Sequence, residues 1–265
     1  MSVLKGVADT LFIPLAARIF VSKKYPEYFY DRKALSLEEH MPDDTILKKS
    51  SEYSLMASAA RYYNMDSMVK SFIAQKGACN IIYLGAGLET AYFRLNEPSA
   101  VFYEIDLPGI IDVRRAVLGE YANEILIGCD IFDMSWAKKI KAGLPSLLIA
   151  SGVFQYFNEN AVLDFINNAR AAFKSCELIF DATNETGIRY ANKYVKKTGN
   201  SGAVMNFYIN DAEEFAKKSA TVLTEQRVFF TDARKMLAGR LKLYTRIAMK
   251  IVDAKKRAFI LHLKI

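Results

Sequence analysis

The sequence CNIIYLGAGLETAYFRL at residues 79–95 determines which fold this 265-residue chain adopts. Residues 79–84 are a short apolar run typical of a buried strand, Gly85 and Gly87 follow it, and a helical pattern begins near Glu89. Glycine has no Cβ, so it lets the backbone turn tightly and approach a ligand. In an open parallel sheet, ligands bind beyond the carboxyl ends of the strands. We therefore expect a binding site at residues 85–87, which we call the glycine loop.

Further strands and helices alternate on both sides of this unit. Short apolar runs predict strands at residues 100–106, 124–131, 146–153, 177–182, 221–230 and 258–265. Helical patterns occupy residues 110–121, 134–142, 160–173, 211–219 and 232–253. Strands that alternate with helices and are apolar along their length indicate a parallel sheet covered on both faces. The sequence thus predicts a Rossmann-like α/β fold whose mostly parallel, seven-stranded sheet contains one antiparallel terminal strand.

The first 75 residues look helical and aromatic, and we expect them to form a lid on a compact unit of residues 76–265. The apolar segment at residues 11–21 is shorter than the about 20 residues that span a bilayer. No small-residue cleavage site follows it, because Lys23, Lys24 and Tyr25 come next. These observations favour a cytoplasmic protein.

Composition excludes several kinds of site. The chain has three cysteines, none in a CxxC pair, and two histidines, so we expect no disulfides, no metal site and no Ser-His-Asp triad. Its net charge of +7 is concentrated after residue 231, where ten Lys or Arg accompany two acids. Lys242, Arg246 and Lys250 form a basic stripe that we interpret as a solvated face; an acidic partner or an anionic membrane is the alternative. We expect no nucleic-acid partner and no stable membrane association, and the oligomeric state stays open.

Two classes of cofactor use a glycine loop of this kind. The dinucleotide pattern G-x-G-x-x-G has a third glycine where this chain has Thr90, and its pyrophosphate would be repelled by Glu89. S-adenosylmethionine carries no phosphate, and its amino group and sulfonium favour a nearby acid. The loop therefore favours S-adenosylmethionine, although a simple strand-to-helix turn without a ligand is the alternative.

Acidic residues at the next two strand ends fit the rest of such a cofactor. Asp106 lies 19 positions after Gly87, close to the spacing at which a carboxylate holds a ribose diol, and Glu104 is expected on the same strand face. Asp130 could accept a hydrogen bond from an adenine amino group while Ile131 flanks the ring. The alternative for each acid is a helix cap.

The sequence resembles the leucine carboxyl methyltransferase family of class I S-adenosylmethionine-dependent methyltransferases, and in particular its bacterial polyketide-type O-methyltransferases. The motifs that carry the resemblance are LGAGLETAYFRL at the glycine loop, FYEIDLP at the second strand, IASGVFQYF at the fourth strand and AARYYNMDSMVKSF upstream. The resemblance extends from about Thr10 to Asp181. It implies the class I methyltransferase fold with an N-terminal helical lid.

The resemblance also implies roles for individual residues. Arg61 would pair with the methionine carboxylate of the cofactor. The other residues implied at the cofactor are Gly85, Ala86, Gly87, Glu104, Asp106, Leu107, Asp130, Ile131 and Ser151. Ser151 stands where the family usually has Glu, which puts the details of cofactor or substrate binding in doubt. Arg18 approximates a basic contact of the family, and we expect Arg18 and Tyr156 to lie near the substrate.

The resulting hypothesis is methyl transfer from S-adenosylmethionine to a carboxylate or acidic hydroxyl of a polyketide-like small molecule. A carboxylate is already ionised at neutral pH and needs no general base, and neither histidine falls near the strand ends, so no catalytic residue is assigned. The alternatives are a protein C-terminal carboxyl methyltransferase, an NAD(P)-dependent oxidoreductase and an inactive cofactor-binding protein.

Overall fold

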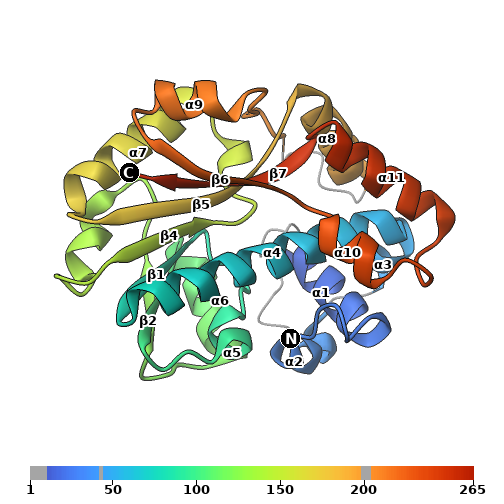
Figure 1. The fold of residues 1–265 in the computed structure, drawn as a ribbon. Helices are drawn as coiled ribbons and strands as arrows, with labels where there is room; N and C mark the ends of the chain where they lie inside the picture. Colours follow the sequence, from blue (N-terminus) through green and yellow to red (C-terminus); the bar gives the residue numbers. More distant parts are fainter. Residues whose placement is uncertain (1–10, 42–43, 198–203) are drawn as a thin grey trace.

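The computed structural model describes residues 11–41, 44–197 and 204–265, and its centre is a seven-stranded sheet of order β3-β2-β1-β4-β5-β7-β6 (Figure 1). The strands are β1 (Cys79–Leu84), β2 (Ala100–Asp106), β3 (Glu124–Gly128), β4 (Ser146–Ala150), β5 (Cys176–Thr183), β6 (Val222–Val228) and β7 (Ala258–Lys264). β7 is antiparallel to both neighbours, and all other pairs are parallel. The predicted sheet is therefore confirmed, including its one antiparallel strand.

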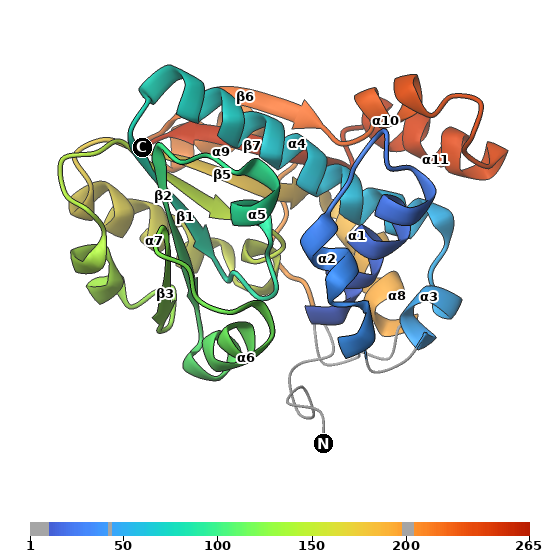
Figure 2. The ribbon, with the colours of Figure 1, turned by 90° about the horizontal axis from the view of Figure 1, so that it is seen from below.

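Helices cover both faces of the sheet (Figures 1 and 2). They are α1 (Phe12–Lys24), α2 (Arg32–Ser36), α3 (Thr45–Lys49), α4 (Glu52–Lys76), α5 (Ala91–Leu95), α6 (Pro108–Leu118), α7 (Glu159–Ala172), α8 (Glu185–Lys197), α9 (Ala212–Lys218), α10 (Thr231–Met236) and α11 (Leu243–Ala254). Short 3₁₀ turns occupy Glu38–His40, Met134–Lys139 and Phe154–Tyr156. No helix in the described ranges has the length and apolar character needed to cross a membrane.

Strand periodicity explains why the sheet has a core on each face. Ile81 packs with α4 and the C-terminal helices, whereas its neighbour Ile82 packs with α7 and α9. Successive side chains of a strand point to opposite faces, so strands covered on both sides are apolar at nearly every position. α4 ends next to the predicted boundary at residue 75, and the division into a lid and a core unit stays a prediction.

Residues 232–253, expected as one helix, form two helices separated by a turn that contains Gly239. The prediction of one helix was wrong because a distant carboxylate sets the start of α11. Glu52 of α4 accepts hydrogen bonds from the backbone N–H of Lys242 at 2.9 Å and from the Thr245 hydroxyl at 2.8 Å. Although burial opposes its charge, hydrogen bonds from Lys24, Tyr25, Lys242 and Thr245 lower the pKa of Glu52 to about 2.

Candidate active site

A cavity of about 570 Å³ lies where the carboxyl ends of the central strands meet α1, α4, α8 and α11. Figures 1 and 2 show α1, α8 and α11 gathered on one side of the sheet, with α4 reaching them from its lower face. The volume is in the range of small-molecule sites, about 300–1,000 Å³. The glycine loop forms one wall of this cavity.

The backbone of the glycine loop requires glycine. Gly85 and Gly87 have φ values of +61° and +49°, a region that L-residues rarely adopt. A Cβ on Gly85 would lie 2.6 Å from Val153 Cγ2, and one on Gly87 would lie 2.8 Å from Leu11 Cδ2. The two positions thus have both the conformation and the close neighbours that exclude a larger side chain.

Asp106, at the end of β2, is hydrogen-bonded to the glycine loop. Its carboxylate accepts hydrogen bonds from the backbone N–H of Gly87 at 2.8 Å and from that of Leu107 at 2.7 Å. Burial raises the pKa of Asp106, and the two N–H donors oppose that effect. A carboxylate has about four lone-pair sites, so acceptor capacity is left for a ligand hydroxyl.

The residues expected at the adenine lie next to Asp106. Cys129 N–H donates to the Asp106 carbonyl at 2.8 Å, which joins the end of β3 to the end of β2. Asp130 is exposed and accepts from the N–H of Phe132 at 2.9 Å, and Ile131 is buried. Asp106, Leu107, Asp130 and Ile131 lie at and just after the ends of β2 and β3, outside the lining of the cavity.

Arg61 of α4 reaches into the cavity and is held by an acid from the end of β5. Its Nη1 lies 3.2 Å from Oδ2 of Asp181, whose Oδ1 accepts the N–H of Gly152 at 2.6 Å. A Cβ on Gly152 would come within 2.8 Å of the guanidinium. Burial works against the charge of Arg61, but Asp181 and Tyr62 raise its pKa above the usual value. Arg61 therefore stays a cation inside the cavity wall.

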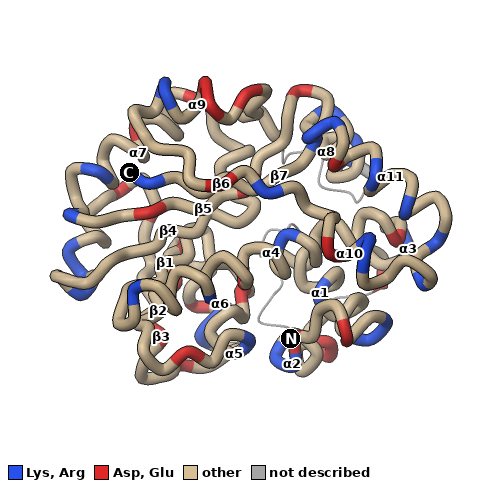
Figure 3. The backbone as a smooth tube through the Cα atoms, viewed as in Figure 1, with Lys and Arg blue, Asp and Glu red and all other residues tan. Residues whose placement is uncertain are grey.

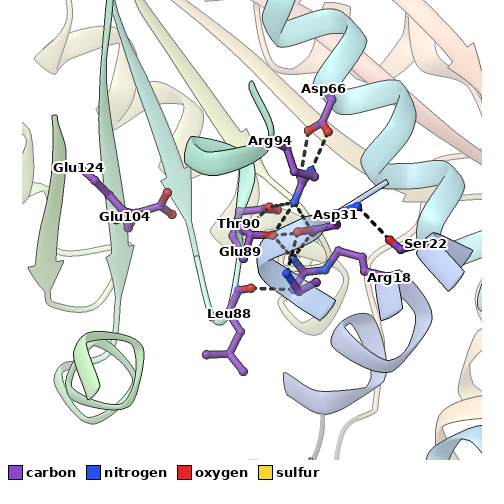
Figure 4. A network of polar contacts seen from close by, with 12 residues as sticks. Arg18, Ser22, Asp31, Asp66, Leu88, Glu89, Thr90, Arg94, Glu104 and Glu124 are labelled. Atoms are coloured by element: carbon purple, nitrogen blue, oxygen red, sulfur yellow. Dashed lines mark hydrogen bonds and ion pairs between the residues drawn. The ribbon is translucent and has the colours of Figure 1, made fainter. Parts of the chain in front are cut away.

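A network of buried ion pairs ties the N-terminal helices to the glycine loop (Figure 4). Arg18 of α1 contacts Asp31 at 3.0 Å, the Thr90 hydroxyl, and the carbonyl of Leu88 at 2.6 Å. Arg94 of α5 pairs with Asp31 at 3.0 Å, and the same guanidinium also binds the two carboxylates Asp66 and Glu89, each at 2.8 Å. Burial would raise the pKa values of Asp31 and Glu89, but the two arginines lower them below normal. Arg18, expected near the substrate, lines the cavity, but its two Nη atoms are already engaged by Asp31, Thr90 and the carbonyl of Leu88.

The structure places Glu104 apart from the other predicted residues. Its side chain is fully buried, lies 3.3 Å from Arg114 of α6, and does not line the cavity. Arg114 also pairs with Glu124 of β3, so one guanidinium faces two carboxyl groups. Burial raises the pKa of Glu104 well above its usual value, which favours the neutral acid. Glu104 therefore belongs to the packing between β2, β3 and α6.

The end of the cavity away from the glycine loop is aromatic and apolar. The residues of this end come mainly from α8 and α11 and include Tyr190, Tyr194, Met205, Tyr244, Ile247 and Ile251. Tyr156, half-buried in the cavity wall, lies instead within electrostatic range of Arg61 and Asp181, and burial raises the pKa of its phenol. The Arg257 guanidinium lies 5.5 Å from the centre of the Tyr190 ring. Within the described ranges Arg257 has no ion pair, so its charge faces this end of the cavity without an acidic partner.

The sequence model of the leucine carboxyl methyltransferase family matches residues 5–170, more than half of the chain. The chain belongs to the leucine carboxyl methyltransferase family. It is accordingly an S-adenosylmethionine-dependent methyltransferase.

Individual proteins are similar to this chain in sequence or in fold. The tetracenomycin polyketide synthesis O-methyltransferase TcmP of Streptomyces glaucescens is 22% identical over 209 residues, which are 78% of this chain and 77% of that enzyme. A DUF574 family protein from Streptomyces avermitilis superimposes with a TM-score of 0.60 at 12% identity and covers 94% of this chain and 96% of its own. Magnesium protoporphyrin IX methyltransferase from Synechocystis, solved with bound S-adenosylhomocysteine, gives a TM-score of 0.52 at 12% identity, covering 83% of this chain and 93% of its own.

The cavity of this methyltransferase fits the polar part of the cofactor. Six buried polar atoms of residues that line it have no hydrogen-bond partner in the described part of the chain: Arg18 Nε, Ser58 Oγ, Arg61 Nε, Tyr83 OH, Ser151 Oγ and Thr183 Oγ1. Buried polar groups without partners are costly, at about 1–3 kcal/mol each. Their presence in the wall of one cavity is therefore an arrangement suited to a polar ligand such as an amino acid moiety.

Two features of the methyltransferase site were not expected from the sequence. Asp181 stands at the end of a predicted strand, and the strand-end rule applied to Asp106 would have found it. Helix α8 was not among the expected elements, although Tyr190 and Tyr194 on it form much of the apolar wall. Its sequence, ETGIRYANKYVKK, is polar on average, although its few apolar residues lie on one face of the helix.

Proposed function

We propose that this methyltransferase transfers the methyl group of S-adenosylmethionine to a carboxylate or acidic hydroxyl of an apolar, polyketide-like small molecule. The observation that carries the proposal is the composition of the cavity, which joins the glycine loop to an aromatic wall bearing the free cation of Arg257. The name of TcmP supports O-methylation of a molecule of this class.

The bound cofactor supplies an electrophilic methyl group on a sulfonium. Arg61, fixed by Asp181, is positioned to pair with an amino acid carboxylate, and Asp106 has free acceptor capacity for ribose hydroxyls. Asp130 and Ile131, which follow β3, are suited to the adenine. Ser151 replaces a carboxylate with a neutral hydroxyl, so the cofactor carboxylate meets one fewer negative charge here.

The chain's contribution to the reaction is positioning and exclusion of water. Holding two reactants in contact replaces a bimolecular step with an effectively intramolecular one. Tyr156, Tyr190 and Tyr194 line the cavity and would hold a planar apolar ring, while Arg257 would attract its anionic group. No histidine belongs to the described lining of the cavity, and an acceptor that is already anionic requires no general base.

Calorimetry separates this proposal from its alternatives. We expect S-adenosylmethionine and S-adenosylhomocysteine to bind and NAD not to bind; the reverse pattern would support an oxidoreductase. Methyl transfer should then be assayed with aromatic carboxylic acids, phenols and a peptide with a free C-terminus. Transfer to the peptide alone would favour a protein carboxyl methyltransferase, and cofactor binding without any transfer would favour an inactive protein.

A pair of variants tests the ribose assignment. Asp106→Ala should weaken S-adenosylhomocysteine binding by about 1.5–3 kcal/mol, as expected for a lost hydrogen bond to a charged acceptor. Glu104→Gln is the matched control, because Glu104 lies on the same strand but its carboxyl group is fully buried against Arg114 and accepts no hydrogen bond from the glycine loop. Equal effects of the two substitutions would contradict a ribose role for Asp106.

A further inference from the structure

Helix α11 carries an apolar stripe that the fold leaves exposed. Leu243, Tyr244, Ile247 and Ile251 are 69%, 70%, 50% and 41% exposed, and their spacing places them on one face of the helix. We call these residues the α11 stripe. The opposite face of α11, which includes Met249 and Val252, is buried against the core.

Cations border the α11 stripe. Lys242, Arg246 and Lys250 are exposed and lie along one edge of it. Among the residues that the structure describes, none forms an ion pair with these three side chains. Figure 3 shows Lys and Arg repeatedly along α11 and the neighbouring α8, with few acids between them. This part of the chain carries the basic surplus found after residue 231.

The other edge of the α11 stripe continues into the cavity. Tyr244, Ile247 and Ile251 are both exposed and part of the cavity lining. Tyr190 of α8, which is 59% exposed, also belongs to the lining at this end. The acceptor end of the cavity therefore opens beside a surface that is apolar and rimmed by cations.

We propose that the α11 stripe docks reversibly on the surface of an anionic lipid bilayer. Leucine, isoleucine and tyrosine side chains would enter the boundary between headgroups and acyl chains, while Lys242, Arg246 and Lys250 pair with lipid phosphates. This combination is the signature of an amphipathic helix that lies in a membrane interface, and α11, with 12 residues, is too short to span one. An acidic protein would account for the cations but not for the four exposed apolar side chains beside them.

Docking of the α11 stripe would bring the acceptor end of the cavity to the lipid, so an apolar acceptor could enter without crossing water. This second step rests on the proposed function, whereas the docking itself does not. The substrate class that follows is a membrane-partitioning, apolar molecule with one anionic oxygen.

Vesicle sedimentation tests the docking directly. The chain should bind vesicles of phosphatidylcholine and phosphatidylglycerol in equal amounts, and bind pure phosphatidylcholine far more weakly. Arg246→Gln with Lys250→Gln should weaken binding about 25-fold, from about fivefold for each cation near an anionic surface. Leu243→Ser should also weaken binding, about fivefold or more, through lost apolar insertion. None of these three residues lines the cavity.

Matched controls lie on the far side of the molecule. Val222→Ser removes an apolar side chain that is 64% exposed on β6, and Lys174→Gln with Lys217→Gln removes two exposed cations; both should leave vesicle binding unchanged. Failure of the wild-type chain to bind the anionic vesicles would overturn the proposal. Sensitivity to the cations with no effect of Leu243→Ser would point to an acidic protein and would also overturn it. S-adenosylhomocysteine binding, measured on every variant, verifies folding and reports on the cofactor site separately.

Discussion

The two ends of the cavity are stabilised by different kinds of contact, ion pairs at one end and apolar packing at the other. Around the glycine loop, ion pairs among Arg18, Asp31, Arg94 and Asp66 connect four separate segments of the chain. At the acceptor end, Tyr190, Tyr244 and Ile247 are half or more exposed, and packing between few apolar side chains replaces the network. A rigid polar frame suits a ligand that never changes, whereas a wall with few directional contacts can accept a variety of apolar shapes. The difference predicts that substitutions at the first end damage the fold and the cofactor site, while those at the second change the acceptor.

The largest effect is expected from breaking the buried network. Arg94→Met would leave Asp31, Glu89 and Asp66 with one cation fewer, and removing one partner of a buried ion pair costs about 3–5 kcal/mol. Urea unfolding measures this loss. Arg115→Met is the control, because Arg115 makes exposed pairs with Asp112 and Glu120 and should change the unfolding curve little. An Arg94 variant as stable as the control would show that the network does not hold this end.

The next effect concerns the cation in the cofactor wall. Arg61→Met should weaken S-adenosylhomocysteine binding by about 2–5 kcal/mol, because a buried charged contact is lost. Arg61→Lys keeps the charge but not the planar fork, so its affinity should fall between that of the Arg61→Met variant and that of the wild type. Arg170→Met, on the far helix α7, should leave calorimetric affinity unchanged. Wild-type affinity in the Arg61→Met variant would remove Arg61 from the cofactor site.

The third effect is a pH dependence outside both ends of the cavity. Because the folded-state pKa of Glu104 is raised above its unfolded value of about 4.5, its contribution to stability is complete below that value and is lost as the pH rises toward the folded pKa. Glu104→Gln cannot ionise, so the stability of the wild type relative to this variant should fall by up to about 1.4 kcal/mol per pH unit above pH 4.5. Urea titrations at about pH 5, 6 and 7, all above the unfolded pKa of about 4.5, measure this difference. A difference that stays constant with pH would mean that Glu104 is ionised in the folded protein.

The smallest effect is expected at the acceptor end. Arg257→Met should raise the KM for an aromatic carboxylic acid about five- to tenfold, because the guanidinium is only half-buried and its charge is partly screened. The affinity for S-adenosylhomocysteine should not change. A neutral acceptor of the same ring size provides the comparison, and an equal rise in its KM would exclude an electrostatic role for Arg257.

Local sequence patterns predicted the cofactor end well. The strands at residues 79–84 and 100–106 have the predicted bounds, and Asp106 lies against Gly87 as its spacing suggested. These features depend on neighbours within about 20 residues, where strand periodicity and turn chemistry determine structure. The prediction that Glu104, on the same strand, lies at the cofactor failed because its environment is set by Arg114 and Glu124 from other elements.

The acceptor end could not be predicted because it is assembled from distant parts of the chain. Glu52 fixes the start of α11 from 190 residues away, and no local pattern shows that contact. Gly187 of α8 packs so closely on Arg257 that a Cβ would lie 2.1 Å from its carbonyl oxygen. The sequence contained these residues but not their pairing, which depends on the order of β5, β7 and the helices that follow them.

The contact between Arg18 and the loop after β1 has a consequence for protein engineering. An exchange of N-terminal segments between members of the family would be a natural way to alter acceptor preference, since α1 and α4 both line the cavity. In this chain, α1 and the segment before α2 carry Arg18 and Asp31, whose partners Thr90 and Arg94 stay behind in the recipient core. A functional chimera would have to transfer all four residues together. Transferring only two of them would leave buried charged side chains without their partners.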